Sequence, residues 1–270
     1  MSSTNDHPTK VSVLLSVRNG AKTIERCIES VCSQTFRDIS LVCVDDCSSD
    51  NTHEMLEMLS GRFPDVPFFI LKNELNLGLT KSLNRGLDII QSPYTARIDA
   101  DDWWDPKKIE DQVVFLDSHP DYAVVGTNYI NHTEVATKYI SLPETNEEIN
   151  KTIFWRNPFA HSCVLYRTDF IKSVGAYNPD VPYSQDYELW VRSLPYTKFH
   201  NLQESLCHRS VGSGLSVDHQ NKQMRLYLRV LRIYLPKYHR PLAEYGAMIE
   251  PIVVLFTPNW IKKLKRRYLP

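Results

Sequence analysis

Apolar and polar residues follow each other in regular blocks along the first hundred residues of the chain. Four apolar runs, rich in β-branched residues, are typical of strands covered on both faces of a sheet. Between these runs, apolar residues recur at the spacing of amphipathic helices. The strands are expected at 11–17, 39–44, 68–71 and 94–96. Strand and helix alternate four times, which predicts βαβ units and a mostly parallel sheet in an α/β domain.

The pattern is less regular after residue 105. A helix beginning near residue 185 is expected, with Ser184 as a candidate N-cap. Apolar residues at helical spacing alternate with arginines over 224–235, which predicts a basic amphipathic helix that Pro236 ends. The remaining expected elements are a helix at 106–116, a strand at 122–125, a helical or mixed stretch at 149–155 and a strand at 159–166.

These patterns divide the 270 residues into three parts. Residues 1–10 are polar and expected to be disordered. Residues 11–215 are expected to form one α/β domain with two halves, 11–105 and 106–215. Residues 216–270 are expected to form a helical, basic C-terminal extension.

Composition narrows the class of protein. Hydrophobic residues make up 42% and charged residues 23% of the chain, as in soluble globular proteins. The net charge of −1 argues against a nucleic acid partner. The longest apolar run, 252–256, is far shorter than the roughly 20 residues that cross a bilayer, and the polar first ten residues do not resemble a signal peptide. None of the six cysteines forms a CxxC pair, so reduced thiols and a cytoplasmic location are expected.

Polar residues gather after three of the predicted strands, where open α/β sheets bind their ligands. These clusters span 16–19, 45–50 and 99–102. The third contains Asp99, Asp101 and Asp102, whose carboxylates repel one another unless a positive charge lies among them. A hard divalent cation such as Mg²⁺ or Mn²⁺ takes such oxygen ligands and often shares them with a phosphorylated substrate. The alternatives are a solvated acidic turn at 99–102 and simple helix capping at 45–50.

Several motifs, in order and spacing, resemble those of family 2 glycosyltransferases of the GT-A fold, of the bacterial surface-polysaccharide type. The motifs are VSVLLSVRNGAKTIERCIESVCSQTF, LVCVDDCSSDNT, NLGLTKSLNRGL and ARIDADD. The resemblance runs in register from Val11 to His119 and continues more weakly at His161-Ser162-Cys163 and at QDYELW. It implies a Rossmann-like, mostly parallel sheet flanked by helices. The first half, 11–105, would bind the nucleotide, and the second, 106–215, would bind the acceptor.

The resemblance also implies roles for individual residues. Asp99, near the ribose, and Asp101 would bind Mn²⁺ or Mg²⁺, and Asp186 would be the general base. His161 is expected to contact metal or phosphate, or to be a core histidine. Arg97 could equally be a structural partner of the acidic cluster, and Asp186 a charge that complements a helix dipole. The nucleotide-binding residues would be Ser16, Arg18, Asn19, Asp46, Lys81, Asn84, Arg97 and Asp99.

Two positions depart from the family pattern. Arg18 stands where family members often have an aromatic residue, so its guanidinium plane would have to stack on the base instead. Gln185 stands where the family has a glutamate, which removes a like charge beside Asp186.

The resemblance predicts metal-dependent, inverting transfer of a hexosyl or N-acetylhexosaminyl group from a UDP-sugar to a saccharide hydroxyl. The acceptor is expected on a lipid carrier, in synthesis of O-antigen, capsule or exopolysaccharide. One alternative is a nucleotidyltransferase, which would be expected to have a Gly-rich, basic loop after the first strand. The other is a non-catalytic nucleotide- or sugar-binding module, which would not need Asp99, Asp101 and Asp186 together.

The C-terminal segment predicts a further partner. Five of the six residues over 262–267 are basic, and Trp260 and Tyr268 flank them. This combination suits the surface of an anionic membrane, so a peripheral location at the inner face of the plasma membrane is expected. A solvated C-terminal helix and a nucleic-acid patch are the alternatives.

Overall fold

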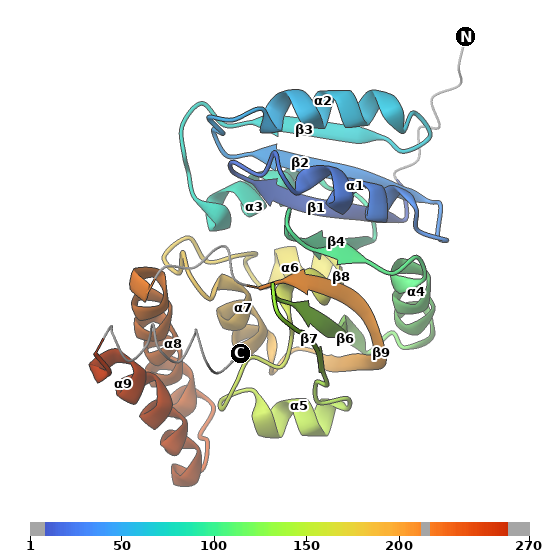
Figure 1. Cartoon of the computed structure of the whole chain (residues 1–270). Coiled ribbons are helices and arrows are strands. Elements are labelled where there is room, and N and C mark those ends of the chain that lie inside the picture. The colour runs from blue at the N-terminus through green and yellow to red at the C-terminus, as the bar shows by residue number, and fades with distance from the viewer. Residues whose placement is uncertain (1–8, 212–216, 259–270) are drawn as a thin grey trace.

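The computed structural model describes residues 9–211 and 217–258 (Figure 1). Most of the expected disordered N-terminus and all of the basic segment 262–267 lie outside the described residues. The described strands form one nine-stranded sheet in the order β3-β2-β1-β4-β8-β6-β9-β5, with β7 paired to β6. The strands are β1 (Val11–Val17), β2 (Ile39–Asp45), β3 (Phe68–Lys72), β4 (Tyr94–Ile98), β5 (Trp103–Trp104), β6 (Tyr122–His132), β7 (Thr137–Ile140), β8 (Leu165–Arg167) and β9 (Lys198–Ser210).

Strands β1 to β4 form the parallel part of the sheet, as the apolar runs predict. Val11 pairs with Ile39 of β2 on one side and with Tyr94 of β4 on the other. Beyond β4 the sheet changes direction, because β8 pairs antiparallel with β4 and with β6. The same sheet therefore runs through both predicted halves of the domain, and β4 lies at the change of direction.

Helices cover both faces of β1, β2 and β4, which explains why these strands are buried along their whole length. On one face, Val13 and Leu15 of β1 join the core formed with α1, α2 and α4. On the other, Leu14 joins the core formed with α3, α7 and α8. The helices are α1 (Ile24–Cys32), α2 (Thr52–Arg62), α3 (Leu79–Ile89), α4 (Lys108–Ser118), α5 (Asn146–Thr152), α6 (Thr168–Ser173), α7 (Gln185–Ser193), α8 (Val217–Lys237) and α9 (Ile249–Phe256), with 3-10 helices η1 (His161–Cys163) and η2 (Leu242–Met248).

Several predictions for the second half were wrong in detail. The expected strand at 159–166 is the 3-10 helix η1 followed by the short strand β8, and the expected strand at 122–125 extends to His132. Ser184 precedes α7, but its side chain caps nothing. Its backbone is left-handed, with φ of 59°, whereas a capping side chain normally extends from β-region backbone.

The C-terminal extension is helical, as predicted. Along α8, Leu228, Leu231 and Leu235 are buried, while the arginines between them are exposed. The helix continues to Lys237 and contains Pro236. The predicted end at residue 235 is therefore two residues too early, because Pro236 lies within the last turn of α8. In the described part of the chain, helices fall short of the length and apolarity needed to cross a membrane.

Candidate active site

The polar clusters after β1 and β2 are joined to each other at one edge of the sheet. The backbone N–H of Asp46 donates to the carbonyl of Val17 at 2.8 Å. The side-chain carbonyl of Asn19 accepts from the backbone N–H of Ser49 at 2.8 Å, and the backbone N–H of Asn19 donates to the Ser48 hydroxyl at 2.9 Å. Asn19 has a φ of 56°, a left-handed conformation that asparagine tolerates better than most residues. These bonds hold the two turns together.

Asp46 is buried, and its carboxylate holds the segment that follows β3. Its Oδ1 accepts from the Asn73 side-chain amide at 2.7 Å and from the Leu77 backbone N–H at 2.8 Å. Its Oδ2 accepts from the backbone N–H of Gly78 at 2.8 Å. Asp46 therefore shapes the wall of a possible base site, in addition to any direct contact with a base.

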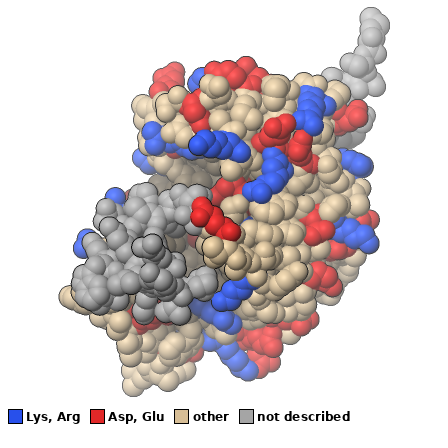
Figure 2. All heavy atoms as spheres, viewed as in Figure 1, with Lys and Arg blue, Asp and Glu red and all other residues tan. Residues whose placement is uncertain are grey.

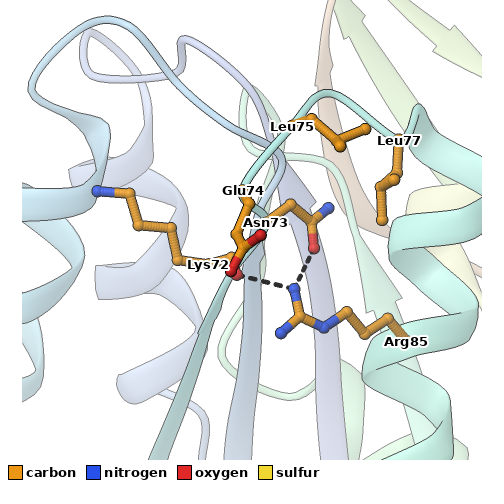
Figure 3. A pocket seen from close by; sticks show the side chains of 6 residues that line it. All are labelled: Lys72, Asn73, Glu74, Leu75, Leu77 and Arg85. Atoms are coloured by element: carbon orange, nitrogen blue, oxygen red, sulfur yellow. Dashed lines mark hydrogen bonds between the residues drawn. The ribbon is translucent and has the colours of Figure 1, made fainter.

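A shallow pocket lies over this same segment (Figure 3). Arg85 of α3 reaches across it and donates to the backbone carbonyl of Lys72 and to the side chain of Asn73. The pocket is lined by Lys72, Asn73, Glu74, Leu75, Leu77 and Arg85. The loop between β3 and α3 is thus fixed from two sides, by Asp46 and by Arg85.

The other predicted nucleotide contacts have different surroundings. Arg18 and Lys81 are exposed, and Ser16 is buried at the end of β1. Asn84 donates to the backbone carbonyl of Tyr177 at 2.7 Å and accepts from its backbone N–H at 3.0 Å. This pair of bonds gives Asn84 a structural role, because it links α3 to the second half, and the nucleotide contact of Asn84 stays a prediction.

The buried Arg97 and the half-buried Asp99 form an ion pair at the end of β4. The Arg97 side chain is fully buried and one of its terminal nitrogens pairs with Oδ1 of Asp99. Burial alone would raise the pKa of Asp99, but the charge and hydrogen bond of Arg97 hold that pKa well below its usual range. Arg97 is thus a partner of the acidic cluster, the second of the two roles expected for it.

Ser162 of η1 completes the surroundings of Asp99. Its hydroxyl accepts from the Asp99 backbone N–H at 3.0 Å and donates to Oδ2 of Asp99 at 3.1 Å. The backbone carbonyl of Ser162 accepts from the indole N–H of Trp104 at 2.7 Å. A residue of the second half therefore orients the first aspartate of the cluster.

Asp101 and Asp102 differ sharply in their partners. In the part of the chain that the structure describes, no other side chain pairs with the Asp101 carboxylate, and burial and the charge of Asp99 raise its pKa. Asp102 is buried and accepts from the backbone N–H of Ser210 at 3.1 Å, with Nε of Arg209 at 3.7 Å. Burial and Asp99 raise the pKa of Asp102 to about 7.

The acidic cluster fits a divalent cation that is shared with a substrate. Among the described residues, no group of three or more His, Cys, Asp and Glu side chains could hold a metal ion by itself. Mg²⁺, however, is commonly held by one or two carboxylates together with substrate phosphates. The carboxylate of Asp101 has no side-chain partner and is repelled by Asp99, and a cation would relieve that repulsion. Asp99 and Asp101 are therefore suitable ligands once phosphate oxygens complete the site.

His161 lies in the core, behind the acidic cluster. Its Nε2 is 2.9 Å from the Tyr177 hydroxyl, and its ring contacts those of Tyr177 and Trp190 edge-on. Burial and the nearby charge of Arg97 lower the pKa of His161 well below its usual value, so the imidazole is neutral. This geometry favours the core histidine among the roles expected for it.

Asp186 lies in the first turn of α7 and has a single side-chain partner among the described residues. The side-chain amide of Asn157 donates to its Oδ2 at 2.7 Å. Burial raises the pKa of Asp186, while the Tyr187 backbone N–H, Asn157 and the charge of Arg97 oppose that rise. A half-buried carboxylate with one oxygen fixed by a neutral donor is suited to accept a proton at the other oxygen.

Sequence reasoning missed Ser162, Asn157, Arg26 and Arg209. Nη2 of Arg26 donates to the backbone carbonyl of Asp101 at 3.1 Å, and its guanidinium lies 3.6 Å from the Trp103 ring centroid. These residues are 29 to 107 positions away from their partners in the chain. The available signals were weak: an arginine near the end of a strand, and polar residues in turns of the second half.

Comparisons with known proteins show the family of the chain. The family model described as "Glycosyl transferase family 2" matches residues 12–175. The amylovoran biosynthesis glycosyltransferase AmsE of Erwinia amylovora is 35% identical over 187 residues, which are 68% of this chain and 69% of AmsE. The UDP-Glc:alpha-D-GlcNAc-diphosphoundecaprenol beta-1,3-glucosyltransferase WfaP of Escherichia coli is 29% identical over 188 residues, 68% of this chain and 70% of WfaP.

Solved structures confirm the predicted fold. S. aureus TarS in complex with UDP-GlcNAc superposes with a TM-score of 0.70 at 19% identity, covering 96% of this chain and 76% of that chain. The mannosyltransferase PcManGT of Pyrobaculum calidifontis, in complex with GDP-Man and Mn²⁺, superposes with a TM-score of 0.68 at 15% identity. The superposition covers 97% of this chain and 74% of PcManGT. The arrangement of strands and helices is therefore that of GT-A proteins.

Proposed function

This chain belongs to glycosyl transferase family 2, and we propose that it transfers a sugar from a UDP-sugar to a hydroxyl of a saccharide acceptor. One observation carries the proposal: the buried Arg97 pairs with Asp99 at the end of β4, and its charge also acts on Asp186 at the start of α7, so one guanidinium lies near both carboxylates. We infer that Asp99, Asp101 and Asp186 serve one site. The UDP-GlcNAc bound to TarS and the UDP-glucose in the name of WfaP support a uridine donor.

Asp99 and Asp101 would hold Mn²⁺ or Mg²⁺, which supplies positive charge against the leaving diphosphate. Arg97 and Ser162 keep Asp99 ionised and oriented. Asp186 accepts the proton of the acceptor hydroxyl as that oxygen attacks the anomeric carbon. A single displacement from the opposite face inverts the anomeric centre, as the family resemblance implies.

The donor's base would lie between the turns after β1 and β2. Ser16, Arg18 and Asn19 form one side of this space, and Asp46 forms the other with the loop that it holds. The exposed Lys81, at the start of α3, is placed to reach a phosphate. This assignment rests on the resemblance and on the joining of the two turns by Asn19.

We further propose that the acceptor is carried on a lipid diphosphate, in the assembly of a surface polysaccharide. The names of AmsE and WfaP support this assignment. A lipid-linked acceptor places the enzyme at the cytoplasmic face of the plasma membrane, where the basic segment 262–267 would contact anionic headgroups.

UDP release from a panel of UDP-sugars, with and without Mn²⁺, tests the proposed reaction. We expect metal-dependent release from one sugar, lost in Asp101→Ala and retained in Asp88→Ala, which changes an exposed carboxylate of α3. Transfer should also be lost in Asp186→Asn. Full turnover by Asp186→Asn would reject the proposed base, and failure to bind UDP in calorimetry would reject the uridine donor.

A further inference from the structure

Helix α9 presents its apolar residues outward. Ile249, Ile252, Val253 and Phe256 follow the i, i+3, i+4, i+7 spacing that places side chains on one face of a helix. All four are exposed, by 37% for Ile252 up to 84% for Phe256. A surface helix of a soluble protein normally turns such a face toward its own core, so this outward face is available to a partner. We call these four residues the α9 stripe.

The other sides of α9 are occupied by the protein itself. The helix packs against α8 and η2, and Pro251 is buried in that contact. Glu250 is the one charged residue in α9; it is exposed and is not one of the four apolar residues of the stripe. The stripe is therefore uncharged and is held outward by a packed support. Leu242 of η2, 87% exposed, is a further outward apolar residue in the same C-terminal unit.

The charge of the chain is divided unevenly around this stripe. Residues 216–270 contain eleven of the 31 lysines and arginines but three of the 32 acidic residues, a net charge of +8 against −9 for residues 1–215. On the face seen in Figure 2, acidic and basic side chains are interspersed over the half that contains α1 and α2. The overall charge of −1 thus conceals a strongly basic C-terminal unit on an acidic body.

Three kinds of partner can be judged by whether they suit both the apolar α9 stripe and the positive charge of residues 216–270. A nucleic acid would satisfy the positive charge but offers no apolar phase for the stripe. A second copy joined by a two-fold axis through the stripe would bring two segments of charge +8 together. An anionic lipid bilayer supplies both headgroup charge and an apolar interior. Amphipathic helices with cations nearby bind to the plane of such membranes.

We propose that the α9 stripe inserts into the surface of an anionic lipid bilayer, with the basic residues of 216–270 contacting the headgroups. This inference rests on the proposed lipid-linked acceptor, and it specifies which face of the protein meets the membrane. An eight-residue helix is about 12 Å long, so the stripe would lie within one leaflet and parallel to its surface. The insertion orients the C-terminal unit toward the lipid that carries the acceptor.

Sedimentation of the full chain with vesicles tests the proposal. The vesicles are phosphatidylcholine alone or phosphatidylcholine with about one third phosphatidylglycerol, since the anionic lipid adds attraction for each nearby cation. Wild-type protein should bind the anionic vesicles and should bind them less at high salt. The double variant Val253→Ser with Phe256→Ser should lose about tenfold or more of this binding, because two inserting side chains are lost.

A matched control uses exposed apolar residues elsewhere. Val135 and Tyr139, 86% and 72% exposed in the hairpin of β6 and β7, can be changed to serine together, and this variant should bind vesicles like wild type. Metal-dependent UDP release is measured on every sample, so that failure of the catalytic proposal is seen separately. Absence of wild-type binding, equal binding by both double variants, or a dimer that dissociates in the Val253→Ser, Phe256→Ser protein would overturn the proposal.

Discussion

Replacing Asn157 with alanine should shift the pH dependence of turnover to higher pH. Asn157 donates a 2.7 Å hydrogen bond to Oδ2 of Asp186, whose pKa is already raised by burial. The amide can donate to the carboxylate and so stabilises the ionised form of Asp186. Without that donor the protonated form of Asp186 becomes relatively more stable, so the pKa of Asp186 rises further. The proposed base is then ionised, and able to accept a proton, only at higher pH.

The size of the shift follows from the strength of the lost bond. A hydrogen bond to a charged group contributes about 1.5–3 kcal/mol, and one pKa unit corresponds to about 1.4 kcal/mol. The acidic limb of the kcat profile should therefore move up by about 1 to 2 pH units. At pH values below the pKa of Asp186 in both proteins, kcat of Asn157→Ala should be about 10 to 100 times lower than kcat of the wild type. At high pH the two kcat values should approach each other.

The assay is kcat against pH at saturating donor, acceptor and Mn²⁺. Asn150→Ala is a matched control, because the Asn150 side chain bonds within α5 to Asn146 and does not reach Asp186. Its profile should coincide with that of the wild type. A loss of rate in Asn157→Ala that is the same at every pH would refute the reasoning, since it would mean that Asn157 acts on structure alone.

Three further predictions concern the support of the site and the core. Ser162→Ala removes two bonds to Asp99 and should weaken Mn²⁺-dependent UDP binding about tenfold in calorimetry; unchanged affinity would contradict the role given to this hydroxyl. Gly86→Ala would place a methyl group against side chains of β1 and β2, so its free energy of unfolding in urea should fall by about 1–3 kcal/mol. Gly61→Ala is the control, because the space around Gly61 is open, and its free energy of unfolding should rise slightly. The opposite order of stability would contradict this packing. Burial lowers the pKa of Lys108 from 10.5 to about 8, so between these pH values the unfolded chain binds more protons than the folded chain, and the stability of the wild type rises with pH. In thermal unfolding, Lys108→Met should therefore be more stable than wild type at pH 7, and this advantage should shrink toward pH 10. An advantage that is the same at every pH would refute the prediction.

The first half of the domain could be predicted because its signals are local. An apolar run such as 39–44 ends where the carboxylates begin, and the parallel sheet brings those ends to one edge. The long strand β9 was not predicted, because its residues do not alternate and its pairing with β6 is interrupted by irregularities. Its burial is correspondingly uneven, so neither helical nor strand periodicity is visible.

The partners of the site residues could not be predicted for a related reason. Asp99 and Asp186 were found from motifs, yet Ser162 and Asn157 lie in turns whose position depends on the whole second half of the chain. The structural role of Asn84 was missed because it depends on the backbone of Tyr177, 93 residues away. The role of a side chain depends on the residues that folding brings into contact with it, and those contacts cannot be predicted from a single sequence.

The dependence of Asp99 on Ser162 affects how enzymes of this family can be recombined. Exchanging the predicted acceptor half for that of a relative at residue 105 would separate β4 from β8, its hydrogen-bonded neighbour, and Asp99 from the hydroxyl that orients it. A chimera with a new acceptor preference should therefore keep the segment 157–167 from the parent that supplies the donor half. An exchange point after residue 167 keeps Ser162 with Asp99 but separates Asp102 from Arg209 and Ser210, so residues 209–210 should come from the same parent as well.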